Sequence, residues 1–448
     1  MEKHDSKPKQ TFKKVGIVNP HCAGIDIGSA LFFVAIDSEK ENVKQFGVST
    51  PDLHLLKQFL IDKGITSVAV EATGAFETPL VNVLRKGGLE VVVTSGTNTK
   101  NYKGIKSDTE DAIHIYELHL LGKLPSILHL EEFSKGIKPM VKARKRLIEV
   151  AADQLRLIQK NLRYANVRID IAFTHSNSVS AIKIVEAVCN GIYDPEELVK
   201  LADNSCKKTK EEIKKLLTGH FDEPTLFLIK QTYRIYLYYQ SEIKEIDKQI
   251  DDYFKKNIQP IPPEQIPNYK IPKGKNTPNI PVEIYAKSLF GVDLTAIPSF
   301  GRDALLIFMA EVGLSIHDFK TDEAFSRWLK LCPNIRGSGK RIFSTKTQKN
   351  KSLLPTALRQ VANAIGNFKD GNPLTQFFHR IAGRSSRKNA ITALAHKLAV
   401  IMWQMTTKKQ EYNYATSDQY KQQLREKQRK KTKKLIAKFG FTGVELSL

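Results

Sequence analysis

The sequence predicts a multidomain protein, with an α/β domain at the N-terminus, a helical coiled-coil region in the middle and a mostly α-helical domain at the C-terminus. Up to about residue 125, short apolar runs alternate with helical patterns. Beyond that point, apolar residues repeat with heptad spacing and then give way to a proline-rich segment. The chain of 448 residues is long enough for two or three domains that each bury a core.

The α/β domain is expected over residues 14–125, after a disordered basic tail of residues 1–13. A tight Gly-Ser turn joins the first two predicted strands, and Pro79 suits the first position of a helix. Ser107 is a good N-cap for the last helix of the domain. The expected strands are 24–28, 31–36, 43–48, 66–71 and 89–94, and the expected helices are 52–63, 78–86 and 107–121.

Two stripes of apolar residues predict long helices in the region 126–258. One stripe steps by three and four residues from Ile148 to Ile169, and the other runs from Leu226 to Phe254. A small helical insert is expected between them, at about 181–219. Helices of this kind form an antiparallel hairpin or a dimerising coiled coil, and a plain helical core is the third interpretation. The spacing does not choose among the three.

Residues 259–283 are expected to be a linker, because they include seven prolines and few apolar residues. Residues 284–407 are expected to fold as the C-terminal helical domain. Residues 408–448 form a basic tail, in which the segment from Tyr420 to Phe439 carries nine Lys or Arg and one Glu. That segment is either a helix that lies on nucleic acid or a solvated arm.

The net charge is the most informative bulk property. Seventy Lys and Arg stand against 47 Asp and Glu, so the formal net charge is +23. A field of this sign attracts polyanions, and nucleic acid is the expected partner because its phosphates dominate binding. An acidic membrane surface is the alternative, although no basic amphipathic anchor helix is evident inside the chain.

The sequence argues against a membrane-spanning, secreted, zinc-binding or disulfide-rich protein. No apolar run reaches the ~18 residues of a membrane span, and the N-terminal residues lack the apolar region of a secretory signal. The four cysteines lie far apart without C-x-x-C spacing, which argues against a zinc site and a disulfide framework. We therefore expect a cytoplasmic, nucleoid-associated protein with reduced thiols and no membrane partner.

Four acidic residues form the candidate metal site: Asp26, Glu71, Asp108 and Asp111. Asp26 lies between two isoleucines on a predicted central strand, where a carboxylate is costly unless a cation or donors compensate it. Glu71 ends another strand, whereas Asp108 and Asp111 are three residues apart on one helix face. Such oxygen ligands suit two hard cations, which can hold a phosphodiester and stabilise its attacking and leaving oxygens. Each acid alone is more simply a cap or a solvated group, so the prediction depends on the set.

At these motifs the sequence resembles the DEDD transposases of bacterial insertion sequences. The matching stretches are Gly24 to Gly28 (G-I-D-I-G), Val70 to Gly74 (V-E-A-T-G) and Lys106 to Ala112, which has K-S-D-T-E-D-A where the family has K-T-D-x-x-D-A. The resemblance implies an RNase H-like (RuvC-like) N-terminal domain. It also implies that the four acids are catalytic and bind Mg²⁺, for which Mn²⁺ can substitute.

Two further motifs resemble the family's C-terminal domain. Leu294 to Gly301 is similar to its helix-hairpin-helix segment, with Ser299 and Phe300 in place of the usual Gly and Ile. Backbone N–H groups of such hairpins bind DNA phosphates. Phe325 to Pro333 is similar to a second family segment, with Lys330 where Gly is usual.

The block Gly337-Ser338-Gly339-Lys340-Arg341 matches the family's serine motif, and the resemblance implies that Ser338 is a catalytic nucleophile. From the local sequence alone, a flexible Gly-Ser turn with basic flanks is the plainer interpretation. A serine hydroxyl needs a base, a metal or a charged neighbour to become reactive. Lys340 and Arg341 can neutralise a phosphate, and with Lys346 they are the candidate nucleic-acid-binding residues. Downstream, Lys349 replaces a family glycine, and Leu354-Pro355 stand where an arginine is common.

The resemblance covers about residues 15–405 and implies a DNA transposase that acts as a site-specific recombinase through a covalent phosphoserine–DNA intermediate. It implies a composite active site in a dimer that pairs into a tetramer, with the coiled coil supplying the assembly. It also implies a noncoding bridge RNA that pairs with target and donor DNA. The alternatives are a metal-only RNase H-like nuclease of the Holliday-junction resolvase type and a non-catalytic nucleic-acid-binding remnant.

Overall fold

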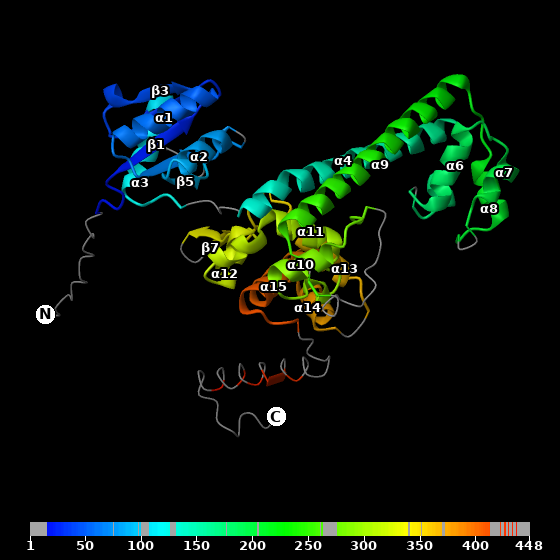
Figure 1. Ribbon diagram of the computed structural model, residues 1–448. Helices are drawn as coiled ribbons and strands as arrows, with labels where there is room; N and C mark the ends of the chain where they lie inside the picture. Colours follow the sequence, from blue (N-terminus) through cyan, green and yellow to red (C-terminus); the bar gives the residue numbers. More distant parts are fainter. Residues whose placement is uncertain are drawn as a thin grey trace. The chain divides into compact units, whose positions relative to one another are not determined.

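The computed structural model of the chain divides into two compact units, Met1–His129 and Leu130–Leu448 (Figure 1). It describes residues 16–74, 76–96, 98–99, 107–125, 131–175, 177–203, 206–259, 261–262, 276–338, 341–350, 352–369 and 372–412, with a few positions between 422 and 436. The predicted N-terminal tail and most of the proline-rich linker lie outside the described residues, as does most of the basic C-terminal tail. Each unit is described by itself.

The first unit contains a five-stranded mixed sheet in the order β3-β2-β1-β4-β5. The hairpin β1-β2 and the hairpin β2-β3 are antiparallel, whereas β1, β4 and β5 run parallel. β1 is therefore the central strand, as the apolar residues around Asp26 predicted. The strands are β1 (Cys22–Ile27), β2 (Leu31–Ala35), β3 (Lys44–Gly47), β4 (Ser67–Glu71) and β5 (Glu90–Thr94).

Helices cover both faces of this sheet. α1 (Thr50–Asp62) and α2 (Glu77–Lys86) pack with the sheet in one core cluster, where Ile25 and Ile27 are buried. α3 (Asp108–Leu120) packs on the opposite face, where Ala112 and Ala35 are buried together. A capping box at Ser49 starts α1, and Ser107 caps α3 as predicted. The α/β prediction for the N-terminal region is thus confirmed, with element bounds that differ by only a few residues.

Two long antiparallel helices, α4 (Glu132–Tyr164) and α9 (Glu223–Asn257), dominate one end of the second unit (Figure 1). The beginning of α4 meets the end of α9, since a side chain at Gly136 would contact the ring of Tyr253. The hairpin interpretation of the two stripes is therefore confirmed within a single chain. The first stripe does not extend to Ile169 on one helix, because α4 ends at Tyr164 and Asn166 adopts a positive φ of 57°.

Four short helices form the predicted insert at the far end of this hairpin. Their buried apolar side chains share one core cluster with those of α4 and α9. They are α5 (Ile169–Ala172), α6 (Val179–Cys189), α7 (Pro195–Lys200) and α8 (Lys210–Leu217).

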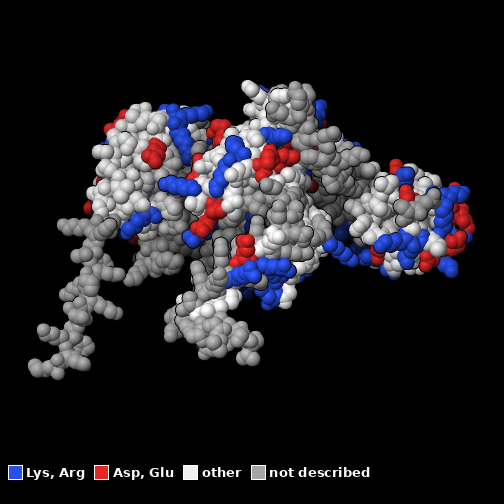
Figure 2. Space-filling model, turned by 90° about the horizontal axis from the view of Figure 1, so that it is seen from below, with Lys and Arg blue, Asp and Glu red and all other residues white. Residues whose placement is uncertain are grey.

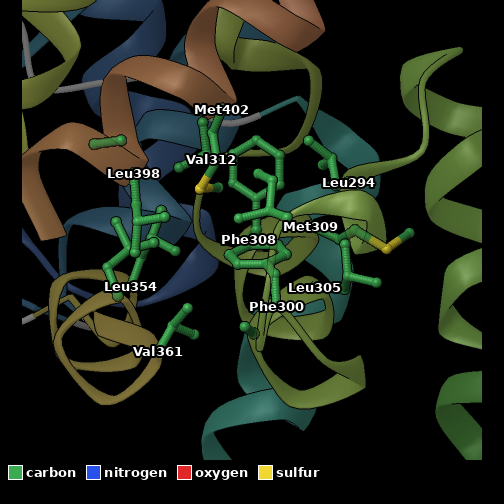
Figure 3. Close-up of a cluster of buried hydrophobic side chains, with 14 of the residues drawn as sticks. Leu294, Phe300, Leu305, Phe308, Met309, Val312, Leu354, Val361, Leu398 and Met402 are labelled. Atoms are coloured by element: carbon green, nitrogen blue, oxygen red, sulfur yellow. The ribbon is translucent and has the colours of Figure 1, made fainter. Parts of the chain in front are cut away.

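The rest of the second unit is mostly helical, as predicted, and packs around one large core (Figure 3). Its buried members include Phe300 and Phe308, together with Leu398 and Met402 of the last long helix (Figure 3). Ile250 and Phe254 of α9 belong to the same cluster, so the base of the hairpin is part of this domain. The elements are α10 (Val282–Phe290), η3 (Leu294–Ala296), α11 (Arg302–Glu311), η4 (Gly313–Asp318), α12 (Asp322–Trp328), β6 (Arg336–Ser338), β7 (Arg341–Ser344), α13 (Leu354–Ile365), α14 (Pro373–Arg384) and α15 (Arg387–Lys408).

Two further expectations can be compared with the structure. Within the described part of the chain, no helix combines the length and the apolar character that crossing a membrane would need. All four cysteines are free thiols.

Candidate active site

β1 and β4 bring the first two candidate acids next to each other. These strands run parallel, with Ile25 opposite Val70. Asp26 and Glu71 each follow directly after that pair, so they lie at the carboxyl ends of neighbouring strands. Side chains alternate along a strand, so Asp26 points away from the face on which Ile25 is buried.

Gly24 allows α3 to lie directly on the Asp26 face of β1. A Cβ atom at Gly24 would overlap the backbone nitrogen of Tyr116 and stand 2.7 Å from its Cα atom. No larger residue fits there unless α3 moves. Because Gly24 and Asp26 are two residues apart on one strand, they share this face. The absence of a side chain at Gly24 therefore lets α3 pack directly against the strand that carries Asp26.

The first turn of α3 carries the other two acids. Ser107 caps the helix, and its Oγ accepts a hydrogen bond from the backbone N–H of Glu110 at 3.2 Å. Glu110 itself forms an ion pair with Lys40, so its carboxylate is engaged elsewhere. Asp108 is exposed, whereas Asp111 is half-buried. Sequence spacing alone had assigned Asp108 and Asp111 to one helix face, and the helix has that form.

The electrostatic environment of Asp26 reflects this crowding. Burial and the negative charges of Asp111, Asp108 and Glu71, in that order, raise the pKa of Asp26 from 3.8 to about 6. A hydrogen bond from the backbone N–H of Ile27 opposes the shift without cancelling it. All four sequence-predicted acids thus interact electrostatically at one end of the sheet.

The four acids do not form a ready-made coordination shell. Among the described residues, which include all four, no three Asp, Glu, His or Cys side chains are grouped closely enough to hold a metal ion. The donor set of carboxylate oxygens is nevertheless the type that hard divalent cations take. A cation would also offset the repulsion that raises the pKa of Asp26.

Glu71 has partners that the sequence did not reveal. The Thr99 hydroxyl donates a hydrogen bond to its Oε2 atom, and a side chain at Gly96 would overlap its carboxylate. Both residues follow β5, which pairs with β4. Their only sequence signal is this position after the neighbouring strand, so they were missed. They orient Glu71 from the side opposite β1.

Ser338 lies in a different kind of setting in the second unit. It ends β6, where it pairs with Arg341 at the start of β7 in a two-stranded antiparallel hairpin. Its side chain is exposed. Among the residues that the structure describes, no acid or histidine hydrogen-bonds to its hydroxyl. An exposed serine hydroxyl is a weak nucleophile unless a base, a metal or a charged neighbour activates it.

The candidate phosphate-binding residues beside Ser338 are partly described. The Arg341 guanidinium lies 5.9 Å from the centre of the Phe343 ring, and both side chains are exposed. Lys346 is exposed too, and its backbone carbonyl accepts a hydrogen bond from the N–H of Asn334 at 3.3 Å. Lys340 lies outside the described residues.

Two family glycine positions that hold other residues here have glycine-like backbone conformations. Ser299, in the segment between α10 and α11, has a φ of 60°, and Lys330, just after α12, has a φ of 55°. Only glycine adopts such angles without steric cost. Ser299 is exposed, and the neighbouring Gly301 has open space around it. Ser299 therefore has the backbone conformation that glycine adopts most easily.

Comparison with protein families gives two matches along the chain. A model of DEDD transposases of the IS110 type, described as "Transposase", matches residues 23–166. A second model, described as "Transposase IS116/IS110/IS902 family", matches residues 293–379. Comparison with curated proteins gives no match.

The two matches contain all three acidic motifs and the Ser338 block, and both describe enzymes that act on DNA. The protein is thus a transposase. More narrowly, the chain belongs to the DEDD transposase family of bacterial insertion sequences. Domains of this family typically use a divalent metal ion, in agreement with the chemistry of the four carboxylates.

Proposed function

We propose that this transposase is a site-specific recombinase in which Asp26, Glu71, Asp108 and Asp111 hold Mg²⁺ and Ser338 is the nucleophile. The observation that carries the proposal is the mutual repulsion of the four carboxylates around Asp26. Such repulsion lowers the stability of the metal-free fold, and a bound cation would relieve it. The RuvC-like character of the sheet domain belongs to the same proposal.

The four acids would supply oxygen ligands, and Mg²⁺ would supply charge stabilisation for a phosphodiester. Mn²⁺ would serve in its place, because it accepts the same oxygen ligands. Thr99 would keep Glu71 oriented when the metal leaves. Gly24 would keep the first turn of α3 close to Asp26. These are roles of the chain's own residues, and each can be tested separately.

Ser338 would exchange one phosphodiester for another. Its Oγ would attack the phosphorus and lose its proton, while the bond from phosphorus to the leaving strand oxygen breaks and that oxygen takes up a proton. The resulting serine–phosphate ester conserves the bond energy for rejoining. Lys340, Arg341 and Lys346 would neutralise the phosphate. Since Ser338 has an exposed hydroxyl, a DNA strand can reach it.

Assembly and guidance complete the proposal. The family resemblance supports a composite site, in which Ser338 of one protomer serves the carboxylates of another within a dimer or tetramer, and a bridge RNA that selects the DNA. The net charge of +23 supports a protein that binds both DNA and RNA. Figure 2 shows Lys and Arg side chains in several patches rather than on one element.

The test is a search for a covalent adduct. Purified protein with its co-purifying RNA, Mg²⁺ and end-labelled DNA of the element junction is resolved on a denaturing gel. Wild type should give a protein–DNA adduct, and Ser338→Ala and Asp26→Asn should give none. Thr345→Ala, which removes an exposed hydroxyl from the same segment, is the matched control and should behave as wild type.

One rival function is favoured by a specific observation. Ser338 has no described base beside it, which suits a metal-only nuclease in which the serine is structural. In that case Ser338→Ala would give the same strand products as wild type, without an adduct in either. A protein without strand chemistry under any metal would instead be a non-catalytic remnant.

A further inference from the structure

A basic cavity of about 710 Å³ lies in the second unit, on elements that the proposed chemistry does not use. Residues 347–350, α13 and the beginning of α15 line it. Four of the lining side chains are cations: Lys349, Arg359, Arg387 and Lys388. No acidic residue lines the cavity among the described parts of the chain. Its charge is therefore uncompensated locally.

Of the two arginines in the lining, Arg359 on α13 has the fewer hydrogen bonds among the described residues. It is half-buried, and its Nη1 atom donates one long hydrogen bond, of 3.5 Å, to the backbone carbonyl of Pro355. No carboxylate pairs with it among the described residues. Burial lowers the pKa of Arg359 because the charged guanidinium loses hydration. An external anion would restore favourable interactions to this group.

Arg387 on α15 is held in place by neutral groups. Its Nη2 atom donates hydrogen bonds to the side-chain oxygens of Asn363 at 2.8 Å and Asn367 at 2.7 Å. Its guanidinium also lies 5.3 Å from the centre of the Phe378 ring. These contacts orient the group but leave its full charge available. Such pre-organisation reduces the entropy lost when an anion binds.

The segment that carries Lys349 is anchored to the same domain. The Asn350 side-chain amide donates a hydrogen bond to the backbone carbonyl of Trp328 at 3.4 Å, and its oxygen accepts one from the N–H of Ser352 at 2.9 Å. This segment follows β7 of the Ser338 hairpin. At Lys349, where the family has glycine, this chain therefore adds a cation to the wall of the cavity.

We propose that this cavity is a subsite for the phosphodiester backbone of DNA. Four cations without an acidic residue among the described lining favour a polyanion, and two guanidinium groups suit the geometry of phosphate oxygens. Ile391 is the one apolar residue among the described lining, which includes no aromatic side chain. The cavity thus lacks a surface on which a base would stack, and it recognises charge rather than sequence. The proposal rests on the proposed function only in taking DNA as the substrate.

The test measures binding without catalysis. Full-length protein is titrated into a fluorescently labelled, mixed-sequence DNA duplex in EDTA, and the Kd is followed over a range of KCl concentrations. In Lys349→Gln/Lys388→Gln, both changes are at exposed side chains, so the fold is retained. We expect the affinity to fall about tenfold for each lost phosphate contact. The slope of log K against log salt should become shallower by about 0.9 per contact.

Arg359→Gln should weaken binding in the same way, with its melting curve checked against wild type. The matched control is Lys183→Gln/Lys248→Gln, which removes two exposed lysines from α6 and α9. An unchanged slope in the cavity variants, or an equal change in the control, would overturn the proposal. Loss of affinity for RNA of the same sequence, with DNA binding intact, would also overturn it.

This test is independent of strand chemistry. The Ser338→Ala protein should bind the duplex with the wild-type salt slope, because the cavity is intact. A failure of the adduct experiment would therefore leave the subsite standing. A failure of the salt experiment would leave the serine mechanism standing.

Discussion

The acidic region of the first unit and the serine region of the second are held by their folds in opposite ways. Asp26 lies on the central strand of a packed sheet, with α3 pressed against Gly24 two residues away. Ser338 lies at the end of a two-stranded hairpin, with an exposed side chain. The acidic region therefore owes its geometry to the core of its unit. The serine region owes little to a core.

The motif departures follow the same division. In the first unit, the three acidic motifs differ from the family pattern only at Ser107, and the structure shows that Gly24 leaves no room for change. In the second unit, Ser299, Lys330 and Lys349 stand at positions where the resemblance to the family leads us to expect glycine. A region whose residues meet solvent tolerates substitution better than one whose residues meet backbone. We infer that the fold restricts the first region more strongly than the second.

The largest expected effect that tests this contrast comes from Gly24→Ala. The new methyl group would overlap the backbone of α3, so we expect a loss of about 3 kcal/mol in the free energy of unfolding. The first turn of α3 should also move away from Asp26, with loss of strand cleavage. Urea unfolding and the gel assay measure the two effects.

Two control variants test the comparison, one for the added methyl group and one for the exposed hairpin. Gly16→Ala adds the same methyl group where nothing lies within 4 Å, so it should behave as wild type. Ser338→Ala, on the exposed hairpin, should change stability by less than about 0.5 kcal/mol. The contrast between the regions is wrong if Gly24→Ala is as stable as Gly16→Ala, or if Ser338→Ala is as damaging as Gly24→Ala.

A smaller effect is expected from the charge of Asp26. Its folded-state pKa of about 6 is raised above the ordinary 3.8, so ionisation destabilises the metal-free fold. The stability that protonated Asp26 provides is complete below about pH 4 and is lost as the pH rises through about 6. Asp26→Asn cannot ionise. Without metal, this variant should exceed wild type by roughly 1–2 kcal/mol above pH 6 and match it near pH 4.

The measurement is urea unfolding in EDTA between about pH 4 and about pH 8. Asp62→Asn, which removes an exposed carboxylate at the end of α1, is measured alongside as the control. Added Mg²⁺ should stabilise wild type and not Asp26→Asn, because the variant lacks one ligand charge. A constant difference between Asp26→Asn and wild type across this pH range would show that the carboxylate is not strained.

Local patterns in the sequence predicted the elements of the acidic region, because each acid marks the end of a strand or the first turn of a helix. They could not predict the contacts of Glu71 with Thr99 and Gly96, which depend on a loop that returns beside β4. They did not predict the strand pairing of β6 and β7. The sequence patterns also could not predict the basic cavity, because Lys349, Arg359 and Arg387 come together only through tertiary packing.

The smallest expected effect concerns the lost glycines of the second unit. Lys330 lies two residues beyond the end of α12 at Trp328. Its N–H donates to the carbonyl of Arg327 at 2.9 Å, and its φ is 55°. Lys330→Gly should therefore raise the free energy of unfolding by about 0.5–1 kcal/mol, because glycine relieves the left-handed strain. Ser299→Gly should give a similar gain, since its φ is 60°.

Lys349→Gly provides the control for this prediction. Lys349 also occupies a family glycine position, but it is not among the described residues with positive φ. Glycine there adds freedom to the unfolded chain without relieving strain, so stability should stay level or fall by a few tenths of a kcal/mol. Thermal unfolding of the three variants separates the cases. If all three glycines stabilise equally, backbone strain is not what distinguishes these positions. If only Lys330→Gly and Ser299→Gly stabilise, the backbone strain lies at these two turns and not at Lys349.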